Sequence, residues 1–416
     1  MKRTLCLWML PLLTDPVWAD ELSDLRAQVQ TLTQQLQSLR DSTEARIAAL
    51  EAALGAAATE STPSTAQPAP GPIVTAPAPQ PGTSSVPYYG GSSGAKLFNP
   101  ETAMIGNFLG TAGRSGGAEG SSASFREGEL GLQAIVDPYA RADFFLAFGE
   151  EGVEVEEAYL TFAALPTQTL AKIGRMRASF GKVNTQHLDA LPSVDYPLPI
   201  LNLLASDEGL IGSGVSLSHF LPAPGDLFAE GTLEIFRGEA EGLFESERKR
   251  DLFYLGHLRT YKDLSEATNL ELGASFASGP NGTALGNRTE LYGLDFTLRW
   301  KPLRRAIYQS FLLRSELYWS NRETEGPDQP AFGFYALAQK QLARRWFLGA
   351  RYDQSERGDD PGATDRGGSL ILTFWPSEFS QLRGQYRRTS YAFGATADEL
   401  LMQVQFSLGA HGAHAF

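Results

Sequence analysis

The sequence predicts an all-β fold whose main domain is a transmembrane antiparallel β-barrel of about 16 strands. From Glu101 onwards, segments of about ten residues alternate apolar and polar side chains and are separated by polar breaks, which is typical of membrane barrels. No run of about 18 apolar residues occurs in the chain, which excludes a membrane-spanning helix. An α-helical coiled coil and a Pro-rich linker are expected before the barrel.

The N-terminus has the pattern of a secretory signal peptide, predicted over residues 1–19. Lys2 and Arg3 precede an apolar stretch, and Val17-Trp18-Ala19 resembles a cleavage site. The single cysteine of the chain, Cys6, lies in this leader. The mature chain is therefore expected to have no disulfide, thiolate metal site or cysteine nucleophile.

Residues 20–55 are predicted to form a periplasmic coiled coil. Apolar residues fall at a 3-4-3-4-3 spacing that places them on one seam of a helix: Leu22, Leu25, Val29, Leu32, Leu36 and Leu39. This seam favours oligomerisation; the alternative is an amphipathic helix that packs on its own domain. Residues 56–95 are rich in Pro, Ser, Gly and Ala, which predicts a semi-stiff linker.

The barrel is expected to occupy residues 96–416. Leu294 and Phe296 fall on one side of a strand and Asp295 and Thr297 on the other, so that one face suits lipid and the other water. The breaks alternate between short and longer, as expected for periplasmic turns and outer loops. Strands are expected near residues 103–110, 125–136, 139–148, 153–163, 169–177, 213–220, 226–237, 251–261, 267–278, 289–300, 306–320, 331–341, 346–355, 367–375, 379–391 and 398–408.

The break over residues 178–211 is much longer than the others, and long loops are usually functional. We expect it to fold inward and narrow the channel, with Arg175, Arg177 and Lys182 at the constriction. The alternative is an outer loop that packs over the mouth or on a neighbouring subunit.

The expected lumen wall carries acidic residues early in the chain and basic residues late. The inward-facing acids are Glu127, Glu129, Glu157, Glu230 and Glu234, and the bases are Arg259, Arg299, Arg314, Arg351, Arg383 and Arg387. Such a wall would set up a transverse field that favours polar solutes. The alternative is a set of ordinary solvated lumen residues, and either ion preference is compatible with it.

Several functions are excluded by composition and motifs. A net charge of -13 opposes binding to nucleic acid. The sequence contains no metalloprotease helix, phosphate loop, dinucleotide fingerprint or credible triad, so we expect neither catalysis nor a cofactor. His411 and His414 are weak candidates for a metal, but two imidazoles do not complete a site, and no metal site is predicted.

The stretch from Lys172 to Lys182, KIGRMRASFGK, carries a family resemblance. Together with the signal, coiled coil, spacer and strand register, it resembles the phosphate-selective-porin-like group of bacterial outer-membrane proteins, over most of residues 100–416. The stretches 184–187 and 407–414 are also similar to proteins labelled zinc-regulated TonB-dependent outer-membrane receptors. The resemblance implies a trimeric, passive diffusion channel without a catalytic step.

These observations predict an outer-membrane porin of a Gram-negative bacterium for small polar or charged solutes. One alternative is a structural tether, in which the coiled coil reaches peptidoglycan and the barrel is an anchor; another is a metal or siderophore uptake porin. The expected partners are outer-membrane lipids, two further copies through coiled coil and barrel, and the barrel-assembly machinery, which would read the terminal Phe416.

Overall fold

The computed structural model describes residues 100–115, 122–150, 152–204, 209–240, 243–245 and 248–409. The chain divides into two units, Met1–Thr83 and Ser84–Phe416, and the described residues belong to the second. The predicted signal peptide, coiled coil and linker lie outside the described residues, as do His411 and His414. Among the residues described, no helix is long and apolar enough to cross a membrane.

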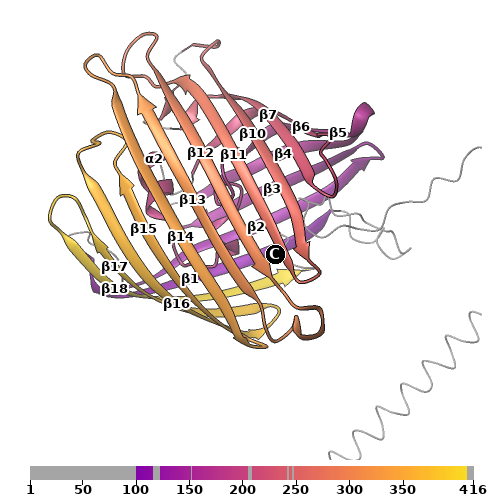
Figure 1. Cartoon of the computed structure of the whole chain (residues 1–416), viewed down its shortest axis with the longest axis vertical. Helices are drawn as coiled ribbons and strands as arrows, with labels where there is room; N and C mark the ends of the chain where they lie inside the picture. Colours follow the sequence, from indigo (N-terminus) through magenta and orange to yellow (C-terminus); the bar gives the residue numbers. More distant parts are fainter. Residues whose placement is uncertain are drawn as a thin grey trace, which may run out of the picture. The chain divides into compact units, whose positions relative to one another are not determined.

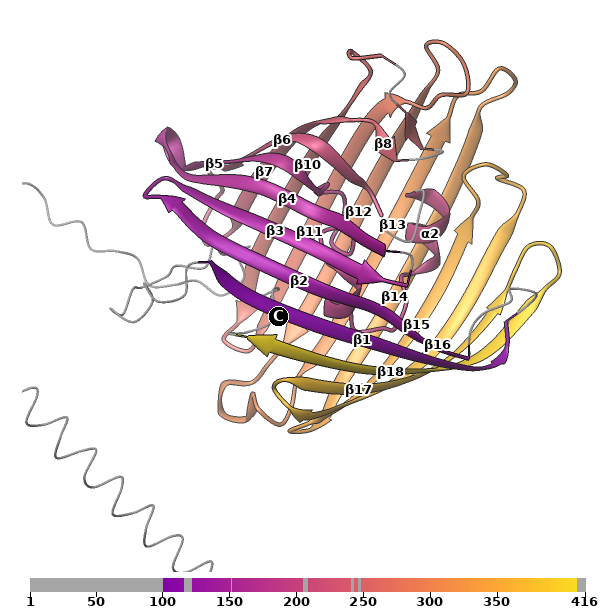
Figure 2. The same cartoon turned by 180° about the vertical axis from the view of Figure 1, so that it is seen from behind.

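Sixteen of the described strands form one closed barrel, in which each strand is antiparallel to its neighbours and β1 pairs with β18 to close the ring (Figures 1 and 2). The predicted strand number is therefore confirmed. The barrel strands are β1 (Glu101–Arg114), β2 (Ala123–Asp137), β3 (Ala140–Gly149), β4 (Gly152–Leu165), β5 (Thr169–Arg177), β6 (Ile211–Phe220), β7 (Phe228–Arg237), β10 (Leu252–Ser265), β11 (Thr268–Pro280), β12 (Arg288–Trp300), β13 (Phe311–Arg322), β14 (Gln329–Ala343), β15 (Trp346–Glu356), β16 (Thr364–Ser377), β17 (Ser380–Ser390) and β18 (Thr396–Gly409).

Alternation of side chains determines which face of each strand points outward. Leu294 is 48% exposed and Asp295 is 5% exposed, although they are neighbours on β12. Asp295 lies opposite Glu316 of β13, and Leu294 lies opposite Leu317, so the two faces remain in phase from strand to strand. The barrel therefore has an apolar outer face and a polar inner face, as the sequence predicts.

Several strand ends differ from the prediction by up to four residues, as at Arg114 of β1 and Ser265 of β10, and two further differences are larger. The strand expected from residue 306 begins at Phe311, because Leu303–Arg305 forms a 3-10 turn and the Tyr308 N–H donates to the Arg305 carbonyl. In the outer loop expected after β7, two short strands, β8 (Glu239–Ala240) and β9 (Phe244–Glu245), form a separate pair. Further 3-10 turns are Pro166–Gln168 and Leu188–Ala190.

Tryptophans cluster with other aromatic or basic side chains near the short turns. Trp346, at the start of β15, stacks on Phe374 of β16 with ring centroids 4.5 Å apart. The Lys340 ammonium lies 4.4 Å from the Trp300 ring centroid. These pairs lie where an interfacial aromatic belt is expected in a membrane barrel.

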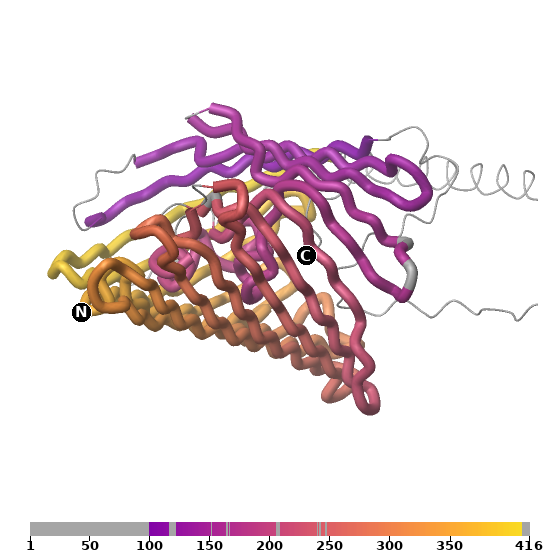
Figure 3. Tube along the Cα trace, turned by 90° about the horizontal axis from the view of Figure 1, so that it is seen from above, coloured from indigo at the N-terminus to yellow at the C-terminus, as the bar shows by residue number. Residues whose placement is uncertain are grey.

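The described chain between β5 and β6 folds into the barrel, and we call residues 178–204 and 209–210 the inserted segment. It contains the one-turn helix α2 (Leu198–Leu203), which contacts β13, β14, β15 and β16. Figure 3 shows the indigo strands of the N-terminal half opposite the orange strands, with magenta chain between them. Apolar side chains of the inserted segment, among them Phe180, Ile200 and Leu204, are fully buried, so the barrel has an internal apolar core.

Candidate functional site

The two ends of the inserted segment are tied together where it leaves the wall. The Ala178 N–H donates to the Leu210 carbonyl at 2.9 Å. The Asn184 amide donates to the carbonyls of Ala178 and Leu210, at 2.8 and 2.9 Å, and its oxygen accepts the Leu210 N–H at 2.6 Å. These hydrogen bonds close the base of the segment and satisfy backbone groups that are buried inside the barrel.

The first turn of the inserted segment docks on Glu316 of β13. The N–H groups of Lys182 and Val183 donate to the two oxygens of this carboxylate at 2.8 and 2.9 Å. The hydroxyls of Tyr318 and Tyr335 donate to the same oxygens at 2.5 and 2.6 Å. Gly181 has a φ of +66°, and an added Cβ would collide with Glu316, so the close approach needs glycine here.

A basic cluster surrounds Glu271 of β11 beside this turn. The Lys182 ammonium lies 2.6 Å from Glu271 Oε1, Arg259 Nε 2.8 Å from the same oxygen, and Arg299 Nη1 3.3 Å from Oε2. Burial lowers the pKa of Lys182 to about 8, although Glu271 opposes the shift. Three cationic side chains thus converge on one carboxylate.

A second cluster joins the inserted segment to β2 and β4 through His187. Its Nδ1 lies 3.2 Å from Glu129 Oε2 and 3.0 Å from Glu156 Oε2, and its Nε2 lies 2.6 Å from Glu157 Oε1. The Arg177 N–H donates to Glu157 Oε2 at 3.1 Å, and its guanidinium lies 3.4 Å from Glu156. This side of the wall is acidic; the inserted segment brings the imidazole of His187 to it, and β5 brings the guanidinium of Arg177.

At β15 and β17 the charges are reversed, and the inserted segment presents Asp195 to arginines of these strands. Asp195 lies 3.0 Å from Arg351 Nη2 and 2.7 Å from Arg387 Nη1, and it accepts from Gln385 Nε2 at 2.6 Å. Burial raises the pKa of Asp195, but Arg351 and Arg387 outweigh it and hold that pKa below its ordinary value. Arg383 Nη1 donates to the Ser193 carbonyl at 3.0 Å.

Most of the predicted site residues meet the inserted segment or lie beside it. Arg314 donates to Gln186 Oε1 at 2.7 Å, and the Glu234 carboxylate accepts the N–H of Ser179 at 2.8 Å. The residues that the structure brings into these clusters are Glu129, Glu157, Arg177, Lys182, Glu234, Arg259, Arg299, Arg314, Arg351, Arg383 and Arg387.

Three predicted residues lie at the margins of these clusters. Glu127 lies close enough to Glu156 and His187 to interact with them electrostatically. Glu230 of β7 lies opposite Arg259 of β10. Arg175 Nε donates to the backbone carbonyl of Val155 at 3.1 Å, so this hydrogen bond is made to β4 backbone and not to a carboxylate.

The inserted segment packs tightly against part of the inner wall and leaves other parts of that wall exposed to solvent. Arg314, Arg351 and Arg383 are at most 5% exposed. A cavity between the segment and this wall, lined by Val183, Leu191 and Arg314 among others, measures only about 10 Å³. The Arg299 side chain is 37% exposed and that of Arg387 is 20% exposed. Water therefore reaches the inner wall along the basic clusters.

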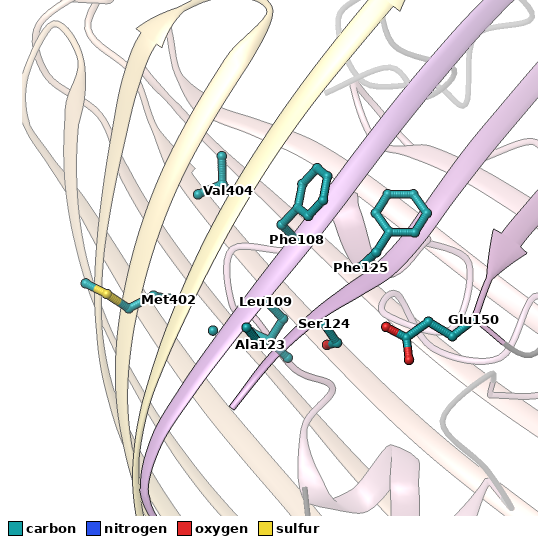
Figure 4. A pocket seen from close by; sticks show the side chains of 9 residues that line it. Phe108, Leu109, Ala123, Ser124, Phe125, Glu150, Met402 and Val404 are labelled. Carbon is teal, nitrogen blue, oxygen red and sulfur yellow. The ribbon is translucent and has the colours of Figure 1, made fainter. Parts of the chain in front are cut away.

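A separate cavity of about 470 Å³ lies on β1, β2 and β18, lined by Phe108, Phe125, Met402 and Val404 among others (Figure 4). Phe108 and Met402 are 44% and 57% exposed, and they alternate with the buried inward-facing residues Asn107 and Gln403. The cavity is therefore an apolar groove on the outer face and is distinct from the charged clusters inside the barrel.

Sequence reasoning missed several acidic residues of the site, among them Glu316, Asp195, Glu271 and Glu156. Glu271 lies between the outward-facing Leu270 and Leu272, so the alternation could have identified it. Glu156 could not be found in this way. A β-bulge, where the register between β3 and β4 shifts, turns both Glu156 and Glu157 toward His187.

No family model matches this chain. A protein of Aquifex aeolicus (strain VF5), described as uncharacterized, is 29% identical over 327 residues, which cover 69% of each chain.

Several solved structures share the fold. The high-pH structure of Pseudomonas putida OprB matches with a TM-score of 0.53 at 8% identity, over 76% of this chain and 96% of that one. An anion-selective porin from Comamonas acidovorans matches with a TM-score of 0.52 at 11% identity, over 74% and 99%. OmpT of Vibrio cholerae in a trimer form matches with a TM-score of 0.50 at 9% identity, over 74% and 98%. At these identities the similarity shows a porin-like fold.

Proposed function

We propose that the chain is an outer-membrane porin, a passive diffusion channel for small polar or charged solutes. The observation that carries this proposal is the inserted segment, which is held to charged residues of the inner wall on β4, β11 and β15 of a closed sixteen-strand barrel. A segment held in this way narrows the lumen without needing a catalytic or energy-coupled step. Barrels of this strand number enclose an aqueous channel in porins.

The proposed solute path follows the solvated basic groups beside the inserted segment. Lys182, Arg259 and Arg299 contact the carboxylate of Glu271, and Arg299, whose side chain is 37% exposed, is the most solvated of the three. The arginines around Asp195 are paired with the segment itself, and the acidic cluster at His187 is largely buried beneath it. We therefore expect the channel to attract small anions more strongly than its overall charge of -13 suggests.

We also propose that the protein is a homotrimer in the outer membrane, with its coiled coil in the periplasm. The support is the similarity in fold to porins, one of which is described in a trimer form. The apolar outer face, with exposed residues such as Leu294 and Leu400, suits contact with lipid or with a neighbouring copy. Barrel-assembly machinery and peptidoglycan remain proposed partners.

A swelling assay with liposomes tests the channel function. The full chain is refolded into liposomes and exposed to neutral sugars of increasing size and to small organic anions. We expect rapid entry of the smallest solutes, a steep fall with size, and no entry in liposomes without protein. A correctly folded protein that admits none of these solutes would overturn the proposal and favour the structural tether.

A further inference from the structure

The cluster around His187 has the composition of a metal site. One imidazole nitrogen and two carboxylate oxygens, from His187, Glu129 and Glu156, all lie within 4.8 Å of one another. Glu129 comes from β2, Glu156 from β4 and His187 from the inserted segment, so three separate parts of the chain converge there. His187 and Glu129 are 3% and 4% exposed.

A β-bulge in β4 brings the Glu156 carboxylate to the other two groups. Glu157 is buried on the inner face, so in a strand without the bulge Glu156 would share the outer face with Ala158 and Leu160, and Leu160 is 38% exposed. The bulge between β3 and β4 instead directs Glu156 toward His187, next to Glu157. A bulge that redirects one side chain is common beside binding sites.

The distances fit a bound ion at Nδ1. Glu129 Oε2 and Glu156 Oε2 lie 3.2 and 3.0 Å from Nδ1 of His187. With metal–ligand distances of about 2.1 Å, ligand atoms of a tetrahedral site are about 3.4 Å apart, so small rotations would accommodate the ion.

Glu157 is placed to accept a hydrogen bond from the second ring nitrogen of His187, as carboxylates do for metal-binding histidines. Its Oε1 lies 2.6 Å from Nε2 of His187, the nitrogen that faces away from Glu129 and Glu156. In a neutral His187 with its proton on Nε2, Nδ1 would offer its lone pair on the side of Glu129 and Glu156, so that a cation bound there would have all three ligands. A carboxylate that accepts the second N–H is characteristic of metal-bound imidazoles.

The local charge also favours a cation. Five carboxylates gather here, those of Glu127, Glu129, Glu156, Glu157 and Asp189. The Arg177 guanidinium, 3.4 Å from Glu156, contributes one positive charge. Several buried carboxylates are stable together only when they are paired or bind a metal.

We propose that His187, Glu129 and Glu156 bind a divalent first-row transition-metal ion that fastens the inserted segment to β2 and β4. One nitrogen and two oxygen ligands suit Zn²⁺, Co²⁺ or Mn²⁺. The proposal does not depend on transport, since the site would bind its ion in a channel or in a structural anchor alike.

The test measures binding of Zn²⁺ to the folded full chain after treatment with a chelator, by titration calorimetry and elemental analysis. We expect about one Zn²⁺ per chain. Glu129→Gln and Glu156→Gln should weaken binding at least 100-fold, and Glu157→Gln by about 10- to 100-fold. Absorption of bound Co²⁺ should show nitrogen and oxygen ligands and should be lost in His187→Gln.

Two controls locate the ion. Glu154→Gln changes an exposed glutamate of the same strand and should bind Zn²⁺ like the unchanged chain. A chain in which His411 and His414 are both alanine should also retain the ion. The proposal is wrong if the unchanged chain binds no Zn²⁺, Co²⁺ or Mn²⁺, if Glu129→Gln and Glu156→Gln leave binding intact, or if binding is lost only with His411 and His414.

Discussion

The carboxylate of Glu316 on β13 accepts the backbone N–H of Lys182 at 2.8 Å, across 134 positions of sequence. The contact sets the position at which the inserted segment turns into the barrel. It also places the Lys182 ammonium against Glu271 of β11, two strands away from Glu316. Glu316 therefore holds the backbone of the segment, and Glu271 holds the Lys182 side chain.

Replacing Glu316 by alanine should loosen the inserted segment. Two backbone N–H groups and the hydroxyls of Tyr318 and Tyr335 would lose their shared acceptor, at a cost of about 2–4 kcal/mol in the free energy of unfolding. We expect larger and noisier channel conductance. Glu378→Ala, at an exposed turn, is the matched control and should change neither stability nor conductance. An unchanged channel in Glu316→Ala would show that this docking does not restrict the lumen.

Asp195 should stabilise the docked segment in a pH-dependent way. Because its pKa in the folded state is below the ordinary 3.8, its contribution is complete above about pH 4 and is lost as the pH falls through the lowered value. Asp195→Asn should cost about 2–3 kcal/mol at pH 7, since Arg351 and Arg387 lose a partner but retain Asp353 and Glu399.

Urea unfolding at pH 7, 5 and 3 tests this expectation. The difference between the unchanged chain and Asp195→Asn should be the same at pH 7 and 5 and smaller at pH 3. Asp328→Asn, in an exposed loop, should show no difference at any of these pH values. A difference that grows toward pH 3 would contradict the assigned ion pairs.

Charges along the solvated side of the lumen should set ion preference. Arg299→Gln removes a half-exposed cation and should shift the reversal potential toward cations, whereas Glu230→Gln should shift it toward anions. A unit charge about 6 Å from a permeating ion in water is worth about 0.7 kcal/mol, roughly a three-fold change in permeability ratio. Shifts of the same sign in both variants would place the ion path elsewhere.

The outward face of β12 should tolerate no charge at its centre. Leu294→Arg places a guanidinium in the lipid and should destabilise the barrel by about 2–4 kcal/mol. Leu303→Arg is the matched control, because Leu303 is 70% exposed in a turn beyond the strand. Heat-modifiable gel mobility and urea unfolding in vesicles measure both. Equal stability of the two variants would contradict the assigned lipid face.

The barrel was predictable because its signal is local. Leu294 and Asp295 differ in polarity at adjacent positions, and this alternation repeats in enough segments to predict sixteen strands and their faces. The strand from Thr169 to Arg177 agrees with the prediction at both ends. The inner-face assignment of Arg351 and Glu129 follows from the same rule.

The pairing inside the barrel was not predictable, because its partners are distant in sequence. Nothing near Asp195 indicates Arg351 or Arg387, and nothing near His187 indicates Glu129. Strand alternation even gives the wrong face for Glu156, since a single bulge reverses it. Strand alternation also does not reveal that the inserted segment carries His187 to the acids and Asp195 to the bases.

Single-channel conductance of the folded full chain in planar bilayers tests the central claim most directly. We predict discrete openings, in groups of three for a trimer, with a reversal potential under a salt gradient that favours anions. Glu316→Ala should enlarge the unit step, and Glu378→Ala should not. A folded barrel that stays silent in the bilayer, alone and as Glu316→Ala, would contradict the account of this chain as a channel narrowed by its inserted segment.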